Sequence, residues 1–464
     1  MATQVHTEIR PVTPPIPFPA SIEPRPKPAA KPKKKLIRRT DRDRSQITRR
    51  GFQAAFLLLN LWIGATFYFW VRQFEPGGTP TSLQRPAGVE GWLPIAGLMN
   101  LRYFILTHHV PTLHPAGMFL LISFLAMSFL FRKAFCSWLC PVGTISEYLW
   151  RAGQKLFRRN FFLPRWLDIP LRGLKYLLLG FFAWAVTSMA ADELAAFMNS
   201  PYGVIADVKM LNFFRHLGEA GAITLGVLVV ASLLIQNFWC RYLCPYGALL
   251  GITSFFSPAR IRRNPETCID CAKCAKACPS ALPVDQLVTI KSAECTGCLE
   301  CVAVCPAKDA LSLSLPVSLT KIPALGPGPA KLPVWAMAAG IAALFFGIVG
   351  FAKTAGYWDS HVPQAIYQQL VPHADEARHP MPGRTEQRQR QRAGAPALHK
   401  PVNSEGIDAC LLPPSPPRSS GIIGLGRKSR KIFEFKGLIR KIFRNKDLAE
   451  NPPHFGILEG SDAW

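Results

Sequence analysis

The sequence predicts an α-helical integral membrane protein of about five transmembrane helices, with a small cysteine-rich α+β module inserted before the last helix. Composition is the first observation: the 464 residues are 49% hydrophobic yet carry a formal net charge of +25. Apolar spans combined with basic cytoplasmic segments explain both values, whereas a soluble globule does not. The second observation is that twelve of the 13 cysteines stand in regularly spaced motifs.

Five stretches are nearly free of charge and have about the 20 residues that cross a bilayer. Buried helices of a large soluble core would also be apolar, but five such segments with basic flanks favour membrane spans. We expect Arg172 and Lys175, at the start of the third stretch, to reach the membrane surface. The five stretches are Gly51–Val71, Pro115–Phe131, Leu171–Ala191, Ala220–Trp239 and Val334–Ala352.

Lysine and arginine are distributed unevenly around these stretches. Thirteen of them lie in the first fifty residues against four acidic residues, and further groups follow the second and fourth stretches. The segments 72–114 and 192–219 are sparsely basic and contain several acidic residues. Because basic loops stay in the cytoplasm, we expect a cytoplasmic N-terminus, a cytoplasmic cysteine-rich module and an outward C-terminus. A reducing compartment also suits thiolates that are kept for metal binding.

Both ends of the chain predict disorder. Residues 1–50 form a proline- and lysine-rich basic segment, and the apolar stretch after it is too long for a signal-peptide core, so we interpret that stretch as a permanent anchor. Residues 353–464 form a C-terminal tail that we expect to be largely disordered. Within the tail, Arg427–Lys446 is a basic amphipathic stretch typical of anionic membrane surfaces, and the lone Cys410 is interpreted as incidental.

The cysteine-rich module, residues 261–315, contains two runs of the form Cys-x2-Cys-x2-Cys-x3-Cys-Pro. Such runs hold two [4Fe-4S] clusters, and the fourth cysteine of each run serves the other cluster. Structural zinc sites also use cysteine quartets, but these usually come as two separated Cys-x2-Cys pairs. We therefore predict a bacterial-type 2[4Fe-4S] ferredoxin-like module. Its ligand sets are Cys268, Cys271, Cys274 and Cys305 for one cluster, and Cys295, Cys298, Cys301 and Cys278 for the other.

A second motif repeats within the membrane domain, residues 51–260. The sequence Cys-x3-Cys-Pro-x-Gly occurs at Cys136 and again, 104 residues later, at Cys240, each time at the cytoplasmic end of a predicted span. In a continuous helix, cysteines at i and i+4 would share one face. A metal or cluster site, a thiol–disulfide relay and transient copper binding all fit, as does simple packing by small residues. The candidate metal ligands are Cys136, Cys140, Cys240 and Cys244.

Two Cys-x3-Cys-Pro motifs after alternate spans, followed by a double ferredoxin motif, resemble the membrane polyferredoxins of the NapH/MauN type. The CcoG/FixG proteins and the membrane part of the NosR proteins share this core. The resemblance covers roughly residues 47–380. It implies a multi-pass protein of the bacterial inner membrane that passes electrons between the quinone pool, or a cytoplasmic donor, and a partner redox system. A fifth span at residues 334–352 is closer to CcoG/FixG, but the tail does not resemble the β-domain that follows it there.

We therefore expect serial one-electron transfer without a catalytic side-chain acid or base. The expected partners are membrane lipid, one or more redox partner proteins and quinol, and no nucleic acid. Two alternatives remain open: reduction or assembly of copper for a respiratory oxidase, and redox sensing by a regulatory membrane protein. Charged residues beside the ligands are expected to tune the cluster potentials: Asp270, Lys273, Lys276 and Glu294.

Three histidines precede the second stretch. His108, His109 and His114 lie near Pro111 and Pro115. A histidine near the membrane surface can accept a quinol proton or bind haem or copper, because its ordinary pKa is close to neutral. The alternative is an exposed interfacial loop without chemistry. The nearby segment 200–205 is a second candidate surface, to which we assign no chemistry.

Overall fold

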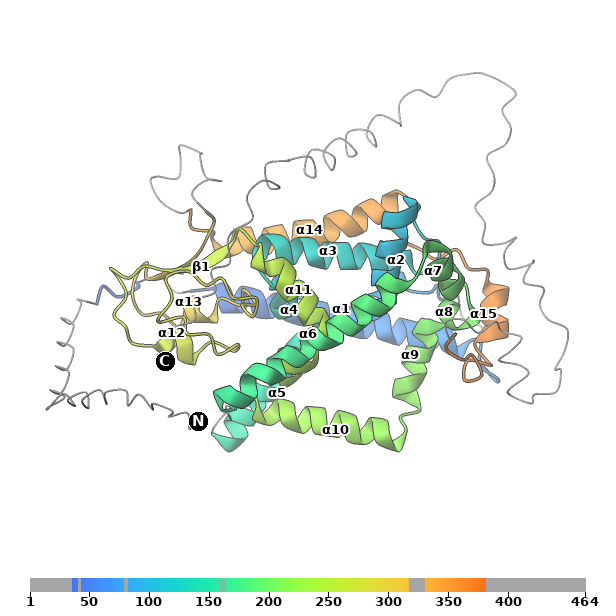
Figure 1. Ribbon diagram of the computed structural model, residues 1–464, viewed down its shortest axis with the longest axis horizontal. Coiled ribbons are helices and arrows are strands. Elements are labelled where there is room, and N and C mark those ends of the chain that lie inside the picture. The colour runs from blue at the N-terminus through green and yellow to red at the C-terminus, as the bar shows by residue number, and fades with distance from the viewer. Residues whose placement is uncertain are drawn as a thin grey trace, which may run out of the picture. The chain divides into compact units, whose positions relative to one another are not determined.

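The computed structural model describes residues 36–40, 43–78, 82–158, 161, 163–316 and 330–380. The expectations for residues 1–35, and for the tail beyond residue 380 with Cys410 and Arg427–Lys446, lie outside these residues. Within the described part the protein is mostly helical, with one two-stranded sheet. Figure 1 shows the sheet and the cysteine-rich loops at one end of a group of long helices.

The membrane part consists of long apolar helices and shorter helices between them. In chain order they are α1 (Ser45–Arg72), the 3-10 helix η1 (Ala87–Trp92), α2 (Pro94–Thr107), α3 (Pro115–Phe131), α4 (Ala134–Trp138), α5 (Pro141–Phe157), α6 (Arg165–Ser188), α7 (Ala191–Met198), α8 (Pro201–Val204), α9 (Ala206–Arg215), α10 (Glu219–Leu234), the π-helix η2 (Trp239–Leu243) and α11 (Pro245–Phe255). After the cysteine-rich module come α14 (Val334–Thr354) and α15 (Gln364–Leu370).

Among the described residues, three helices are long and apolar enough to cross a membrane: α1, α6 and α14. Helices α9 and α10 meet at an 80° bend and give a fourth span only if the pair is one broken span. The predicted second span is α3, a shorter apolar helix of 17 residues that contacts α2, α11 and α14. By length and composition, the described residues therefore contain three or four candidate spans, with α3 as a shorter apolar helix beside them, and the count of five stays a prediction.

The third predicted span begins earlier than expected. Helix α6 starts at Arg165, so Lys175 lies well inside the helix rather than at its entry. Its side chain is fully buried, and its Nζ lies 2.6 Å from both carboxylate oxygens of Glu294 in the cysteine-rich module. The expectation that Lys175 reaches the membrane surface is therefore wrong, because an acidic partner from another part of the chain is available.

The N-terminal boundary also differs from the prediction. Helix α1 begins at Ser45, ahead of the apolar stretch, and carries the buried polar residues Arg49 and Gln53 in its first turns. Residues 36–40 run along the cysteine-rich module: Arg39 N donates to the Pro306 carbonyl and Lys308 N donates to the Ile37 carbonyl, both at 2.9 Å. The end of the predicted disordered segment is thus ordered by contact with the module.

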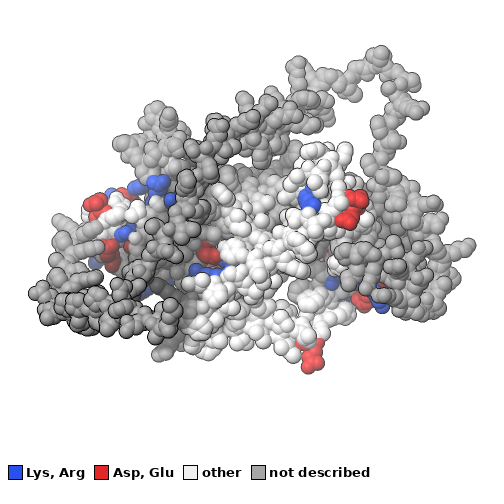
Figure 2. Space-filling view, viewed as in Figure 1, with Lys and Arg blue, Asp and Glu red and all other residues white. Residues whose placement is uncertain are grey.

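The cysteine-rich module contains β1 (Arg260–Arg263), α12 (Lys273–Lys276), α13 (Glu300–Ala303) and β2 (Leu311–Ser314). The two strands pair antiparallel, with Arg260 opposite Ser314, and so join the two ends of the module. One hydrophobic cluster includes Ile261 and Leu299 of the module together with Phe135 and Ile341 of the membrane helices. The module therefore packs against the helices in a shared hydrophobic core and is not connected to them only through a linker. In Figure 2 charged residues gather at the end of the molecule where Figure 1 shows the module, while the face over the helices is mostly uncharged.

Candidate iron–sulfur centres

The two cysteine runs of the module fold into the same backbone shape. In each run the second cysteine lies between two residues with left-handed backbone: Asp270 and Ala272 in the first run, and Gly297 and Leu299 in the second, with φ between 55° and 63°. Immediately after this turn, the one-turn helices α12 and α13 bury the third cysteines, Cys274 and Cys301. The tight turn gathers three thiols of each run around one point.

Each group of three thiols lines a small cavity together with a fourth thiol from the other run. Cys268, Cys271 and Cys274 share their cavity with Cys305. The second cavity is lined by Cys278 and by the other run. Four thiolates are the donor set of a [4Fe-4S] cluster, so the residues fit that group. Burial raises the pKa of Cys298 to about 12, and that of Cys278 and Cys301 as well, so cluster assembly must displace their protons.

The second run is held against the membrane helices through its backbone. Gln46 Nε2 of α1 donates to the Cys298 carbonyl at 3.0 Å, and Ser137 Oγ of α4 donates to the Thr296 carbonyl at 2.7 Å. Trp138 Nε1, also in α4, donates to the Gly297 carbonyl at 3.2 Å. Three consecutive carbonyls of the cluster loop are thus fixed by two membrane helices.

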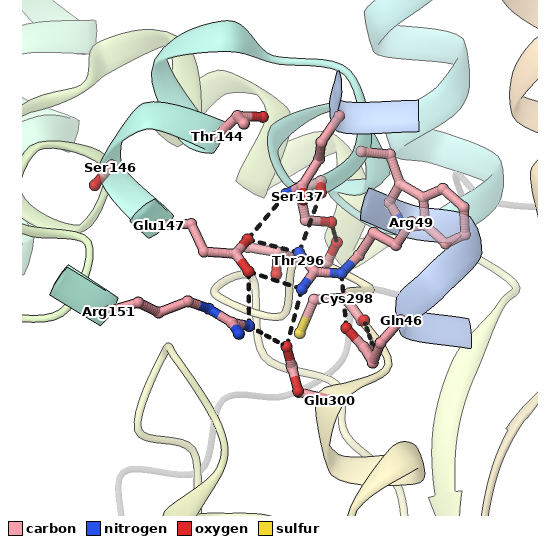
Figure 3. Close-up of polar contacts among 12 residues, drawn as sticks. Gln46, Arg49, Ser137, Thr144, Ser146, Glu147, Arg151, Thr296, Cys298 and Glu300 are labelled. Atoms are coloured by element: carbon pink, nitrogen blue, oxygen red, sulfur yellow. Dashed lines mark hydrogen bonds and ion pairs between the residues drawn. The ribbon is translucent and has the colours of Figure 1, made fainter. Parts of the chain in front are cut away.

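A buried ion-pair network reinforces this contact (Figure 3). Arg49 of α1 is 1% exposed and makes a bidentate pair with Glu147 of α5, with N–O distances of 2.6 and 2.8 Å. Its Nη2 also lies 2.9 Å from Glu300 Oε1, and Arg151 Nη2 bridges Glu300 and Glu147 at 2.5 and 2.8 Å. Glu300 directly precedes the ligand candidate Cys301. The first run, by contrast, contains the exposed Cys271.

The Cys-x3-Cys-Pro-x-Gly motif ends one helix and starts another. Cys140 and Cys244 have extended backbone and are the N-caps of α5 and α11. The Sγ atoms accept hydrogen bonds from the N–H groups of Gly143 and Gly247, at 3.4 and 3.3 Å. Proline at the first helical position lacks only an N–H that would be unpaired there. The helix therefore does not continue through the motif, so the condition for the two cysteines to share one helix face is not met, and the second copy forms a π-helix before the cap.

The four cysteines of the two motif copies line one large cavity. We call Cys136, Cys140, Cys240 and Cys244 the membrane thiols. The cavity has a volume of about 980 Å³, and its apolar walls include Phe56, Ile63 and Phe345. Arg85 and Trp358 also line it. Burial raises the pKa of Cys136 to about 11 and that of Cys140 to about 12. Among the described residues, no three His, Cys, Asp or Glu side chains lie close enough to share one metal ion.

Charged side chains, several of them buried, line or adjoin the cavity of the membrane thiols. Lys133 Nζ lies 3.9 Å from Glu294 Oε2, which Lys175 also contacts. Burial by itself would raise the pKa of Glu294, but the charges of Lys133 and Lys175 outweigh it and hold that pKa below its ordinary value. Asp168 likewise pairs with Arg172 and Arg241. We call these six residues the inner charge cluster: Lys133, Lys175, Glu294, Asp168, Arg172 and Arg241.

A different polar cluster lies around the histidine expected to be exposed. His114 is 3% exposed; its Nδ1 is 3.2 Å from Arg85 and its Nε2 is 2.9 Å from the Gly203 carbonyl. Arg85 also pairs with the buried carboxylates Glu90 and Asp207, at 2.8 and 2.7 Å. The expectation of an exposed histidine loop thus holds for His108 and His109 and is wrong for His114. The segment 200–205 supplies the carbonyl that fixes His114.

Sequence reasoning missed several of these residues. Lys133, Arg49, Glu300 and Glu147 were not singled out, and Glu294 was expected only to tune a cluster. The signal that could have identified them is a charged residue inside or beside an apolar stretch. Such a residue usually pairs with an opposite charge inside the protein. Arg49 and Lys133 flank predicted spans, where basic residues are typical of cytoplasmic boundaries, so the pattern alone does not distinguish them from other flanking charges.

Comparison with known proteins places the motifs in their family. A family model described as a 4Fe-4S binding domain matches residues 113–161 and 217–264, and one described as a 4Fe-4S dicluster domain matches residues 259–313. The chain is 51% identical over 326 residues to the protein named "Putative electron transport protein YccM" of Escherichia coli (strain K12); the match covers 70% of this chain and 90% of YccM.

More distant relatives share parts of the chain. It is 33% identical over 194 residues to the regulatory protein NosR of Pseudomonas aeruginosa, covering 40% of this chain and 25% of NosR. It is 25% identical over 228 residues to the ferredoxin-type protein NapH of Haemophilus influenzae, covering 47% of this chain and 74% of NapH. No solved structure matches the chain.

Proposed function

Since this chain belongs to the family of membrane-associated 4Fe-4S electron transport proteins that includes YccM, we propose that it relays electrons between the quinone pool, or a cytoplasmic donor, and a partner redox system. The protein lies in the inner membrane of a bacterium, with its N-terminus and its module in the cytoplasm. The observation that carries this proposal is the pair of four-cysteine cavities, one of which is anchored to membrane helices.

The two four-cysteine cavities support the proposed ligand sets. Cys268, Cys271, Cys274 and Cys305 hold one [4Fe-4S] cluster, and Cys295, Cys298, Cys301 and Cys278 hold the other. Bound clusters supply storage and transfer of single electrons. The protein positions the clusters through the second loop, whose carbonyls accept hydrogen bonds from Gln46, Ser137 and Trp138. Arg49 neutralises the negative charge of Glu300 next to this loop.

The two loops suggest the order of the clusters along the relay. The exposed Cys271 marks the first loop as the side where a soluble redox partner approaches. The second loop adjoins the large cavity, because Pro279, Ser280 and Thr296, next to its cysteines, line the cavity wall. Electrons therefore pass between the cytoplasm and the membrane through the first and then the second loop, or in the reverse order.

The large cavity supports quinol as a membrane partner. It has apolar walls and a polar end that carries thiols and buried charges, a combination typical of sites for amphipathic small molecules. Copper reduction is the second candidate function, because the membrane thiols are soft ligands that suit Cu(I).

Anaerobic purification in detergent tests the proposed function. We expect about eight iron and eight sulfide at the ferredoxin motifs per chain, and EPR signals that a reduced quinol analogue generates. A Cys271→Ser variant should lose one of the two signals, while Cys410→Ser, outside the motifs, should lose none. Clusters that only dithionite reduces would point to a low-potential cytoplasmic donor. Full iron content in Cys271→Ser would contradict the ligand assignment.

A further inference from the structure

We propose that Arg132 is a buried counter-charge for the cluster of the second loop, and that it raises the reduction potential of this cluster. This inference rests on the proposed function, because it needs a cluster at the second loop, and it adds a residue that sets the potential of that cluster. Three observations carry it: the full burial of Arg132, its lack of a carboxylate partner, and its contact with the loop that holds Cys295.

Arg132 is the C-cap of α3 and links α11 to the cysteine-rich module. It is 0% exposed. Its Nη1 donates to the Ser254 carbonyl of α11 at 3.2 Å, and its Nη2 donates to the Ser292 carbonyl of the module at 2.5 Å. Its Nε has no hydrogen-bond partner among the described residues. The end of α3 thus carries a charged side chain that is closed off from water.

The charge of Arg132 is not cancelled by an acidic side chain. No carboxylate oxygen of the described residues lies within 4.0 Å of its guanidinium, so Arg132 stands outside the inner charge cluster, whose two lysines share Glu294. Its acceptors are backbone carbonyls, and that of Ser254 belongs to the last turn of α11. Carbonyls at a helix C-terminus carry partial negative charge. The alternative role is therefore structural: an arginine that ties helix ends to the module.

The guanidinium of Arg132 is one hydrogen bond away from the backbone of Cys295. The Ser292 carbonyl that accepts from Arg132 also accepts the N–H of Cys295, at 3.2 Å. The end of α3 also packs against the middle of the second loop. A Cβ at Gly297 would lie 3.1 Å from the Phe131 carbonyl oxygen and 3.6 Å from Arg132 Cβ. A cluster at the second loop therefore lies next to Arg132.

The position of Arg132 affects the reduced form of the cluster more than the oxidised form. Reduction adds one negative charge, and in a site closed off from water this charge is poorly solvated, so burial by itself makes a cluster harder to reduce. A nearby positive charge stabilises the reduced form, and buried charges are screened much less than exposed ones. Arg132 therefore offsets the burial of the second cluster, whereas the first loop is open to solvent at Cys271.

Redox titration of the anaerobically purified full chain, followed by EPR, tests the proposal. The second-cluster signal is the one that Cys298→Ser loses and Cys271→Ser keeps. Arg132→Gln keeps a hydrogen-bond donor and removes the charge, so this cluster should become harder to reduce. We expect at least a tenfold shift in the ratio of oxidised to reduced cluster at fixed potential, or about 59 mV for a one-electron couple.

Arg132→Lys separates charge from structure. It keeps the positive charge but cannot reproduce the planar contact with two carbonyls, so the potential should stay close to that of the wild type. A shift in Arg132→Lys as large as that in Arg132→Gln would assign the effect to the structural role and overturn the proposal.

A second neutral variant keeps the test valid if Arg132→Gln does not assemble both clusters. Arg132→Met has a similar length, and apolar side chains can replace buried charges without loss of stability. The matched control is Arg102→Gln: Arg102 also donates to a backbone carbonyl, that of Val186 at 2.6 Å, but it lies in α2, at the other end of the helices from the module (Figure 1). Neither cluster should shift in this control.

The outcomes also separate the proposal from the proposed function. An unchanged second-cluster potential in Arg132→Gln or Arg132→Met would overturn the role of Arg132 and leave the relay standing, provided that the wild type holds about eight iron at the ferredoxin motifs. Fewer than about eight iron per chain in the wild type would overturn the proposed function together with this inference.

Discussion

Single residues explain why the repeated motif has its particular form. Cysteine at the N-cap turns its sulfur toward the free N–H groups of the next helix, and proline follows where no N–H is needed. The glycine two residues after the proline is required for space in the first copy. A Cβ at Gly143 would overlap the carbonyl oxygen of Cys136, whereas a Cβ at Gly247 would meet its nearest neighbour, the Cys240 carbonyl oxygen, at an ordinary 3.6 Å.

This difference predicts unequal effects of the same substitution in the two copies. Gly143→Ala should destabilise the protein by about 1–3 kcal/mol, the usual cost of overpacking. Gly247→Ala should be within about 0.5 kcal/mol of the wild type, the range of substitutions that disturb no contact. Thermal unfolding in detergent measures both. Equal losses in the two variants would show that the carbonyl contact at Gly143 is not the cause.

His114 makes stability depend on pH. Burial by itself would lower the pKa of His114, but the hydrogen bond and charge of Glu90 outweigh it and raise that pKa above its ordinary value of 6.5. A raised pKa means that folding favours the protonated form, so its contribution is complete below pH 6.5 and is lost as pH rises through the folded-state pKa. The melting temperature should therefore fall with rising pH in this window.

The comparison variant for this pH effect is His114→Gln, which keeps polar contacts but does not titrate. Its melting temperature should be lower than that of the wild type at pH 6 and should change less between pH 6 and 9. A pH slope that persists undiminished in His114→Gln would assign the effect to another group.

At the scale of elements, the contact between the module and the helices depends on a buried network. Arg49 of α1 joins Glu147 of α5 to Glu300 at the start of α13, so three elements meet at one guanidinium. Removal of one partner from a buried ion pair costs more than the pair contributes, because the other charges remain buried without compensation.

Arg49→Met should therefore lower the stability of the docked state by about 3–5 kcal/mol. Arg50→Met, at the exposed neighbouring position, should change it by no more than about 0.5 kcal/mol. Hydrogen exchange of the loop 296–301 measures the effect locally, and Arg49→Met should speed it while Arg50→Met does not. Unchanged protection in Arg49→Met would show that the backbone hydrogen bonds alone hold the loop.

At the scale of the whole molecule, the number of spans depends on whether α3 crosses the membrane. Seventeen residues extend about 26 Å as a helix, slightly less than a hydrocarbon core of about 30 Å. Contacts with α2, α11 and α14 surround α3, so much of it faces protein rather than lipid. A helix that is shorter than the hydrocarbon core can still cross the membrane if its flanking residues extend to the interface or if the bilayer is locally thinner.

Reporter fusions test the topology. Alkaline phosphatase fused after His109, between α2 and α3, should be active, because the preceding segment is poor in lysine and arginine. A fluorescent protein fused after Phe157, at the end of α5, should fluoresce, because the basic loop that follows stays in the cytoplasm. Active phosphatase at both positions would show that α3 enters and leaves on the same side.

The sequence by itself determined the features that depend on composition and short spacing. Apolar stretches longer than a bilayer is thick predict the helices α1, α6 and α14, and the family comparison confirms iron–sulfur electron transfer as the function of the cysteine runs. These features are local: a span needs only its own hydrophobicity, and a cluster loop needs only its own spacing.

Only the tertiary structure decided which distant charges meet. Lys175 and Glu294 are 119 residues apart, and Arg49 and Glu300 are 251 apart, yet each basic side chain is buried against its acidic partner. The tertiary structure also brings the two copies of the Cys-x3-Cys-Pro-x-Gly motif together, because all four membrane thiols line one cavity. No period or motif encodes such partners, because a buried charge needs only an opposite charge nearby in space, whatever its place in the sequence.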